Sequence, residues 1–187
     1  ICLAAFGGYG RQEMAPYSDI DLLFILPYKK TAWSEQVVEY ILYMLWDMGF
    51  EVGHAVRTVE ESIRLCKEFL TIKTSLLEMR YIWGEKVLFD ELISKYDRKI
   101  VKGNAPEFTE EKLEERDKRH KRLGDTRYVV EPNLKEGKGG LRDLHTLFWI
   151  AKFIYKVHKV SEVVKKGVLS DEEYKEFQKA EEFLWAV

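Results

Sequence analysis

The sequence is poor in cysteine and has no long apolar run. Cys2 and Cys66 are its only cysteines, and they show neither metal-ligand spacing nor a disulfide framework, which favours a reducing compartment and a cytoplasmic protein. The longest apolar stretches, such as residues 20–27, are too short to span a bilayer. A membrane protein is therefore not expected.

An excess of charge of one sign is also absent. With 30 basic and 32 acidic side chains the formal net charge is −2, which argues against a general nucleic-acid binder and leaves a small charged substrate open. The 187 residues are 46% hydrophobic and 13% aromatic, which is enough for one packed domain or a small pair of domains.

The first residues lack an initiator methionine and a basic flank. Residues 1–6 resemble the middle of a buried strand rather than a signal peptide. A helical pattern is still running at Val187. We therefore expect a piece of a longer protein, truncated at both ends.

Strand and helix signals alternate in the first half of the chain. Short apolar runs predict buried strands, and apolar side chains at helical spacing predict amphipathic helices. A capping box at Thr58 and Glu61 opens one of these helices. The expected strands are residues 1–6, 19–26 and 50–57, and the expected helices are residues 31–49, 62–69, 70–81 and 86–100.

The second half is expected to be mostly helical, after a hinge within residues 102–106. A short strand is expected at residues 127–131, and a glycine-containing loop then leads into a helix over residues 141–155. Ser170 and Glu173 have the capping-box spacing that opens a last helix. These patterns predict a first domain over residues 1–103 and a helical domain over residues 104–187.

Two aspartates and a glycine pair carry the clearest chemical signal. Because side chains alternate along a strand, Asp19 and Asp21 lie on the same face at its start. Two carboxylates at that separation repel each other unless a cation lies between them, and Mg²⁺ prefers oxygen ligands. The pair predicts a metal site, with a solvated strand edge as the alternative.

The glycine pair follows the first expected strand. Gly7 and Gly8 would let backbone N–H groups approach phosphates, since a side chain there would block close contact. A tight bend is the alternative interpretation of the pair. A phosphate-binding turn beside metal-binding carboxylates suits phosphoryl or nucleotidyl transfer, in which a nucleophile attacks the α-phosphorus and pyrophosphate leaves.

Three blocks of sequence carry a resemblance to a known family. They are residues 7–23 (GGYGRQEMAPYSDIDLL), 45–58 (LWDMGFEVGHAVRT) and 131–144 (EPNLKEGKGGLRDL). The first resembles the signature of the DNA polymerase beta-like nucleotidyltransferase superfamily, and all three are similar to blocks of the bacterial PII uridylyltransferase/uridylyl-removing family. The resemblance implies an α/β fold, a small mixed-sheet nucleotidyltransferase domain followed by a helical domain that closes the nucleotide cleft.

The resemblance also implies an activity. Members of the family transfer UMP from UTP, with Mg²⁺, to a tyrosine of the trimeric PII nitrogen-signal protein and release pyrophosphate. They remove UMP through an HD hydrolase domain and sense glutamine through ACT domains. The sequence contains no His-Asp doublet, so we expect the transferase half at most, without the HD and ACT domains. A transferase for another nucleotide or acceptor, or a nucleotide-binding regulatory module without turnover, stays open.

Residue roles carry over position by position. Asp19 and Asp21 correspond to the metal ligands, and Gly7 and Gly8 to the phosphate turn, with Ser18 as a further candidate for nucleotide binding. Many superfamily members place a third carboxylate on the strand after the long helix. Glu51 is the candidate for it here, with a surface glutamate at the strand end as the alternative.

Basic residues supply the remaining candidates. Arg57 shares the strand face of Glu51 and is expected either to neutralise triphosphate charge or to pair with a nearby acid, whereas His54 lies on the other face and is expected to be structural. Arg11 and Glu13 are expected either to orient the metal ligands or to form a local salt bridge.

The last block adds a possible anion site. Gly139 and Gly140 directly precede a helix, whose N-terminal N–H groups attract anions, and Lys135, Lys138 and Arg142 lie near them in the sequence. Asn133 has the groups to contact a base or ribose, although capping a turn is the more common role of a loop asparagine, and Arg142 and Asp143 have the alternative of pairing with each other.

Overall fold

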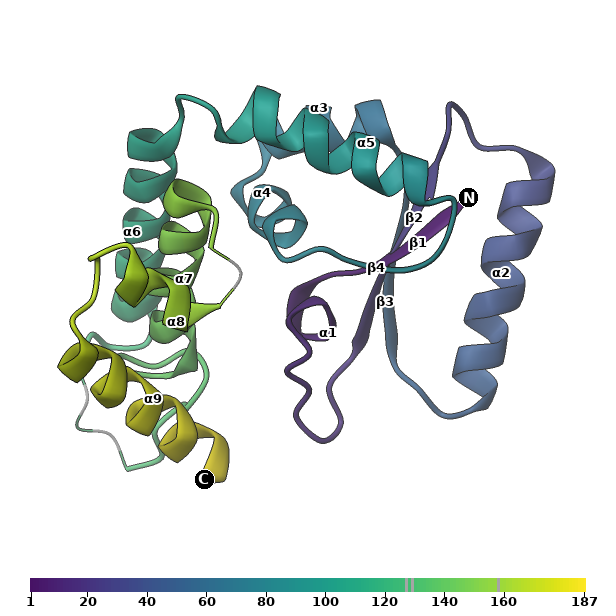
Figure 1. The fold of residues 1–187 in the computed structure, drawn as a ribbon. Helices are drawn as coiled ribbons and strands as arrows, with labels where there is room; N and C mark the ends of the chain where they lie inside the picture. The colour runs from purple at the N-terminus through teal and green to yellow at the C-terminus, as the bar shows by residue number, and fades with distance from the viewer. Residues whose placement is uncertain (127, 129, 158) are drawn as a thin grey trace. The chain divides into compact units, whose positions relative to one another are not determined.

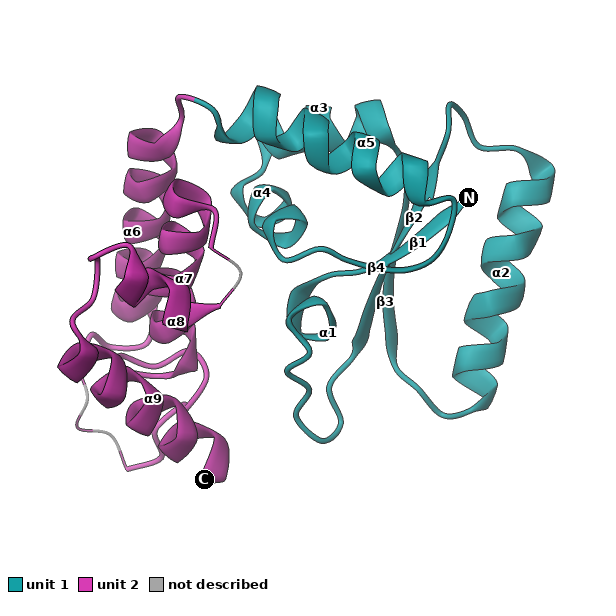
Figure 2. Ribbon diagram, viewed as in Figure 1, with its two compact units in different colours: residues 1–102 teal, residues 103–187 magenta. Residues whose placement is uncertain are grey.

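The computed structural model describes residues 1–126, 128, 130–157 and 159–187. The chain forms two compact units, Ile1–Lys102 and Gly103–Val187 (Figure 2). Each unit is described by itself below.

Unit 1 contains a four-stranded mixed sheet in the order β3-β2-β1-β4 (Figure 1). Strand β1 (Cys2–Ala5) is antiparallel to both β2 (Ile20–Leu26) and β4 (Arg80–Gly84), while β2 and β3 (Val52–Thr58) are parallel. The expected α/β fold class, with a mixed-sheet domain followed by helices, is thereby confirmed.

Strand β2 is covered on both faces, which explains its nearly continuous apolar sequence. On one face Leu22 and Phe24 pack against Val38 and Leu42 of α2 (Ala32–Asp47), which lies along one side of the sheet (Figure 1). On the other face Leu23 is also buried, and α3 (Val59–Glu68) and α5 (Lys86–Tyr96) contact the sheet.

Helix boundaries follow local capping chemistry. The side chain of Thr31 accepts a hydrogen bond from the Ser34 N–H, and the Ser34 side chain accepts one from the Thr31 N–H, which caps α2. Gly49 follows the helix with a φ of +83°, a left-handed conformation that glycine adopts readily. Thr58 caps α3 through the Glu61 N–H at 3.1 Å, as its spacing predicts.

One expectation for unit 1 is wrong. The predicted helix over residues 70–81 ends as α4 (Leu70–Leu77), and Arg80–Gly84 forms the edge strand β4 instead. Pairing with β1 overrides the local helical spacing, because this stretch contains the strand-forming residues Tyr81, Ile82 and Trp83. The Gly7-Gly8 turn also continues into a short helix, α1 (Gly7–Arg11). A π-helical turn, Asp97–Val101, follows α5.

Unit 2 is helical in its described residues. Its helices are α6 (Ala105–Arg122), α7 (Leu141–Tyr155), α8 (Val160–Lys165) and α9 (Asp171–Ala186). The predicted helix over residues 141–155 and the Ser170–Glu173 capping box are confirmed. The strand expected at residues 127–131 falls partly on residues 127 and 129, which lie outside the described residues. Across the described part of the chain, no helix combines the length and hydropathy needed to cross a membrane.

The core of unit 2 contains a stacked aromatic pair. Phe108 on α6 and Phe153 on α7 are almost fully buried, with ring centroids 4.0 Å apart and planes 10° from parallel. Replacing Phe108 with alanine should lower the free energy of unfolding of unit 2 by about 3–5 kcal/mol, because a buried aromatic ring leaves a cavity. Chemical denaturation measures this loss. The control Phe183→Ala removes a ring that is 65% exposed and should have little effect; equal losses in both variants would contradict the packing described.

Candidate active site

The carboxylate of Asp21 lies between two glycines. Asp21 is the second residue of β2, and its register partner on β3 is Gly53. A Cβ atom placed on Gly53 would lie 2.6 Å from Asp21 Oδ1, and one placed on Gly7 would lie 2.6 Å from Oδ2. Both contacts are closer than a side chain allows, so the carboxylate occupies this position because both neighbours are glycines.

Backbone hydrogen bonds hold the strands together at this point. The Phe6 N–H, between β1 and α1, donates to the Asp21 carbonyl at 3.1 Å, and the Ile20 N–H donates to the Glu51 carbonyl at 2.8 Å. These bonds join β1, β2 and β3 at the end of the sheet where Asp21 lies. The sheet thus sets the backbone position of Asp21 and the face from which its side chain projects.

Asp19 and Glu51 lie at the same end of the sheet as Asp21. Asp19 directly precedes the first residue of β2 and Glu51 that of β3, and both are exposed. The parallel register pairs Ile20 with Val52, so Asp19 and Glu51 precede neighbouring positions. Within the described residues, no group of three or more His, Cys, Asp or Glu side chains is arranged to hold a metal. These three acids therefore do not form a complete metal site by themselves.

The oxygen ligands present fit a Mg²⁺ ion that shares its coordination with a substrate. Magnesium in phosphate-transferring proteins is bound by one or two carboxylates together with substrate phosphates and water. Asp19 and Asp21 are such a pair, and the glycines on either side of Asp21 leave its oxygens without side-chain cover from those positions. The arrangement suits a metal that arrives with a nucleotide.

The Gly7-Gly8 turn borders the Asp21 carboxylate directly. Gly7 begins α1 with a φ of +57°, which other residues rarely adopt. The first N–H groups of a helix have no partner within the helix, so this end of α1 presents donors near the carboxylate. Ser18 is exposed, directly before Asp19, and its N–H donates to the Ala15 carbonyl at 3.1 Å. The structure thus brings Gly7 together with Asp21 and places Ser18 two residues before the start of β2.

The Arg11 side chain binds two acidic side chains. Its Nη1 donates to both carboxylate oxygens of Glu78 at 2.8 Å, and its Nε donates to Glu13 at 2.7 Å. Burial alone would lower the pKa of Arg11, but the charge of Glu78 and the hydrogen bonds from Arg11 to Glu78 and Glu13 raise it above its usual value. Of the two interpretations of Arg11 and Glu13, the local salt bridge is therefore the one the structure contains, with Glu78 as a partner that the sequence did not reveal.

Arg57 lies away from the carboxylates. It shares a face of β3 with Gly53, as expected, but its register partner is Ile25, four positions beyond Asp21. Four residues along a strand span about 13 Å. Its charge acts instead on the thiol of Cys66, whose pKa burial raises to about 12 although Arg57 and Lys73 lower it. His54, on the other face, packs edge-on against Trp46 with centroids 6.4 Å apart, which supports its structural interpretation.

The expected anion site before α7 is filled by groups of the chain itself. The N–H groups of Leu141, Arg142 and Asp143 donate to carbonyls of the preceding loop at 2.9 Å each. The Gly139 N–H donates to the Asp143 carboxylate at 2.7 Å. Gly140 is buried, and a Cβ there would lie 2.5 Å from the Leu134 carbonyl. The two glycines thus shape a folded loop, because the donors at the start of α7 already have partners.

The other candidates of this loop also have internal roles. The Asn133 side chain accepts hydrogen bonds from the N–H groups of Lys135 and Glu136 at 3.1 and 2.8 Å, so it caps a turn. Arg142 donates to Glu136 at 3.1 Å and lies 5.4 Å from the centre of the Trp149 ring. Lys135 is exposed, and Lys138 pairs with Asp125 at 2.8 Å.

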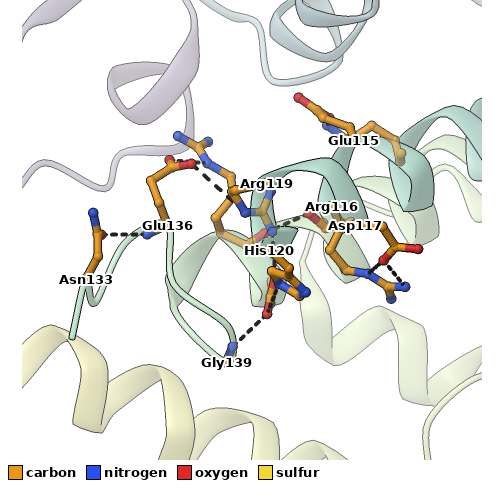
Figure 3. Close-up of polar contacts among 12 residues, drawn as sticks. Glu115, Arg116, Asp117, Arg119, His120, Asn133, Glu136 and Gly139 are labelled. Atoms are coloured by element: carbon orange, nitrogen blue, oxygen red, sulfur yellow. Dashed lines mark hydrogen bonds and ion pairs between the residues drawn. The ribbon is translucent and has the colours of Figure 1, made fainter. Parts of the chain in front are cut away.

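Asp143 is the centre of a polar cluster that holds the loop to α6. Figure 3 shows Arg119 and His120 on α6 and Gly139 in the loop. The Asp143 carboxylate accepts from Arg119, from His120 Nε2 at 2.9 Å and from the Gly139 N–H. Burial raises the pKa of Asp143, but the hydrogen bonds from Gly139, His120 and Arg119 outweigh burial and hold the pKa below its usual value. Arg142 and Asp143 therefore bind other partners rather than each other.

The mixed sheet, the glycine turn and the aspartate pair define an α/β domain of the nucleotidyltransferase type, followed by a helical unit. Residues 107–187 match the family model described as GlnD PII-uridylyltransferase. All 187 residues align with the bifunctional uridylyltransferase/uridylyl-removing enzymes of Bradyrhizobium sp. strain ORS 278 and strain BTAi1 at 58% identity, and of Novosphingobium aromaticivorans at 57%. Over its whole length the chain is therefore similar to enzymes of this family.

The alignment covers the whole of this chain but only 20% of the length of each of these relatives. Their names describe two activities, uridylyl transfer and uridylyl removal. The three sequence blocks quoted above lie in both units.

A pair of glycine variants tests the position of the Asp21 carboxylate. Gly7→Ala should displace this carboxylate and lower nucleotide-dependent activity by about 100-fold, because misplacement of a reacting group by 1 Å has effects of this size. The matched control is Gly49→Ala, since Gly49 also has a positive φ but has no atom within 4 Å of an added Cβ. Equal activity in the two variants would show that the close approach to Asp21 has no function.

The Asp143 cluster predicts a pH dependence of stability. Because its folded pKa is depressed, the carboxylate stabilises unit 2 fully above about pH 4, the unfolded value, and this contribution is lost as the pH falls through the folded pKa. Asp143→Asn should lower the free energy of unfolding by about 2 kcal/mol at pH 7, and this difference from wild type should shrink below about pH 4.

Chemical denaturation at a series of pH values measures this difference. The control is Asp117→Asn, which removes an exposed carboxylate paired with Arg116 on the same helix as Arg119 and should cost less than about 1 kcal/mol. A difference for Asp143→Asn that stays constant down to pH 3 would contradict the assignment.

Proposed function

We propose that this chain carries the transferase site of its family, which moves UMP from UTP to a tyrosine of the PII signal protein and releases pyrophosphate. The proposal is supported by the match to a family described as PII-uridylyltransferase and by the relatives named as uridylyltransferases. One structural observation carries it: the Asp21 carboxylate is held between Gly7 and Gly53, at the start of the glycine turn.

Asp19 and Asp21 would hold the Mg²⁺ ion, since both carry a carboxylate at the N-terminal end of β2, where Asp19 is exposed. When bound, the ion neutralises phosphate charge and stabilises the charge that develops on the leaving pyrophosphate. Two carboxylates leave positions on the ion for phosphate oxygens. The site is thus suited to a nucleoside triphosphate rather than to a metal held by protein alone.

The chain's own groups supply binding and proton transfer. The backbone N–H groups of the Gly7-Gly8 turn would bind phosphate oxygens, because glycine lets the backbone approach them closely. The tyrosine oxygen of the acceptor forms a bond to the α-phosphorus, the bond from the α-phosphorus to the bridging oxygen breaks, and pyrophosphate leaves with the bonding electrons. Glu51 is exposed at the start of the neighbouring strand and is the candidate to accept the phenolic proton.

The direct test is transfer of label from α-labelled UTP to purified PII protein in the presence of Mg²⁺, with ATP, GTP and CTP as parallel substrates. Label should appear on PII from UTP. Asp21→Asn should reduce transfer by at least about 100-fold, because metal-ion stabilisation of the transition state is worth several kcal/mol. Asp47→Asn, an exposed aspartate on α2, is the control and should leave transfer unchanged.

Three results would contradict parts of this proposal. Efficient transfer from another nucleotide would identify a different substrate, and binding of Mg-UTP without turnover in the presence of PII would identify a regulatory module. Normal activity of a folded Asp21→Asn variant would remove the metal-binding role from this residue.

A further inference from the structure

A buried ion pair connects α1 to the end of α4. Glu78 immediately follows α4, and its side chain is only 3% exposed, while that of Arg11 at the end of α1 is 11% exposed. A single guanidinium nitrogen, Nη1, lies 2.8 Å from each carboxylate oxygen of Glu78. The two residues are 67 positions apart in the sequence, so the pair fixes one segment of unit 1 against another.

The same corner makes further contacts with α1, through its backbone and through the Arg80 side chain. A Cβ on Gly10 would lie 2.4 Å from the Glu78 carbonyl oxygen, which shows how closely α1 approaches this corner. Arg80, at the start of β4, donates from Nη2 to the Tyr9 carbonyl at 2.9 Å, and its guanidinium lies 5.1 Å from the centre of the Tyr9 ring. The short helix is therefore held along its last turn by residues of the α4–β4 corner.

The opposite end of α1 borders the candidate active site. Gly7, its first residue, lies against Asp21, and the Gly10 N–H donates to the Phe6 carbonyl at 2.9 Å. A helix of five residues has too few internal hydrogen bonds to keep its direction by itself. A change in the contacts at Arg11 therefore changes the direction in which the glycine turn presents its N–H groups.

We propose that Arg11 and Glu78 are positioning residues for nucleotide binding: the ion pair holds α1 so that the Gly7-Gly8 turn faces the phosphates beside Asp21. This inference rests on the proposed function, because it assigns the turn to phosphate binding. Arg11 is assigned this positioning role instead of a direct contact with nucleotide. The reason is that Nη1 and Nε of its guanidinium are already bound to Glu78 and Glu13.

The test uses Glu78→Gln and Arg11→Gln in the intact protein, singly and together. The turn contacts phosphates in the bound substrate and in the transition state alike, so each variant should raise KM for UTP by about 10–100-fold and change kcat by less than about 3-fold. The double variant should be no worse than the more impaired single variant, because both changes act through one contact. Arg64→Gln, which breaks the exposed Arg64–Glu68 pair on α3, is the control and should leave KM unchanged.

A second readout does not depend on activity. Hydrogen exchange of the amides in residues 6–13 should accelerate in Glu78→Gln by about 10-fold or more, while amides of β2 and α2 keep their protection. The Gly10 amide is the most informative, because its hydrogen bond to Phe6 lies within the segment that the ion pair holds.

The outcomes separate the possible roles. Local acceleration together with a raised KM supports positioning. Wild-type KM in both single variants overturns it, as does loss of protection throughout unit 1, which would show a role in stability alone. A fall in kcat with unchanged KM and unchanged exchange would also overturn it, because it would show direct participation in the chemistry. If the wild-type protein neither binds nor uses Mg-UTP, the proposed function fails, and the exchange data alone decide whether Glu78 holds α1.

Discussion

The close approach of the Asp21 carboxylate to two backbone segments is the constraint on which unit 1 depends. Gly7 and Gly53 each come so near to this carboxylate that a methyl group would lie 2.6 Å from one of its oxygens. The three strands that meet here are joined by backbone hydrogen bonds, which fix the position of the Asp21 backbone. Everything proposed for the site follows from this: an anionic group next to a turn that presents N–H donors.

The ionic contacts of the chain differ in what they hold in place. Arg11 and Glu78 hold the short helix that follows β1, whereas Asp143, with Arg119 and His120, holds the loop that precedes α7. Both are partly or fully buried, so the loss of one partner leaves a charge without compensation. In each case a segment rich in glycine, which has little conformational preference of its own, is fixed by a charged side chain at its end.

Much of unit 1 follows from local sequence patterns. The apolar runs of β1 and β2, the helical spacing of α2 and the alternation along β3 predict these elements, because each depends on residues close together in the chain. Strand β4 depends on pairing with β1, about 80 residues earlier, and its local pattern resembles a continuation of α4. The Arg11–Glu78 pair could not be predicted for the same reason, because its partners are far apart in the sequence. The close approach at Gly53 did have a local signal, since a glycine within a strand pattern indicates close backbone approach.

For the candidate site residues, too, local pattern was enough for some features, whereas others depend on how distant segments pair. Alternation correctly placed Arg57 on the face of Gly53, but its distance along the strand from Asp21 required the register of β2 and β3. Gly139 and Gly140 resembled an anion site, yet the loop folds back so that its carbonyls and Asp143 accept the N–H groups. A motif shows which donors are available, whereas only the folded loop shows which of them already have partners.

The most direct measurement of the central claim is paramagnetic broadening of backbone amides by Mn²⁺, added in place of Mg²⁺ with UTP. The account predicts that the amides of Gly7, Gly8 and Gly53 broaden strongly, and that Asp21→Asn abolishes the effect. Strong broadening elsewhere, with these three amides unaffected, would contradict a metal-nucleotide site at Asp21.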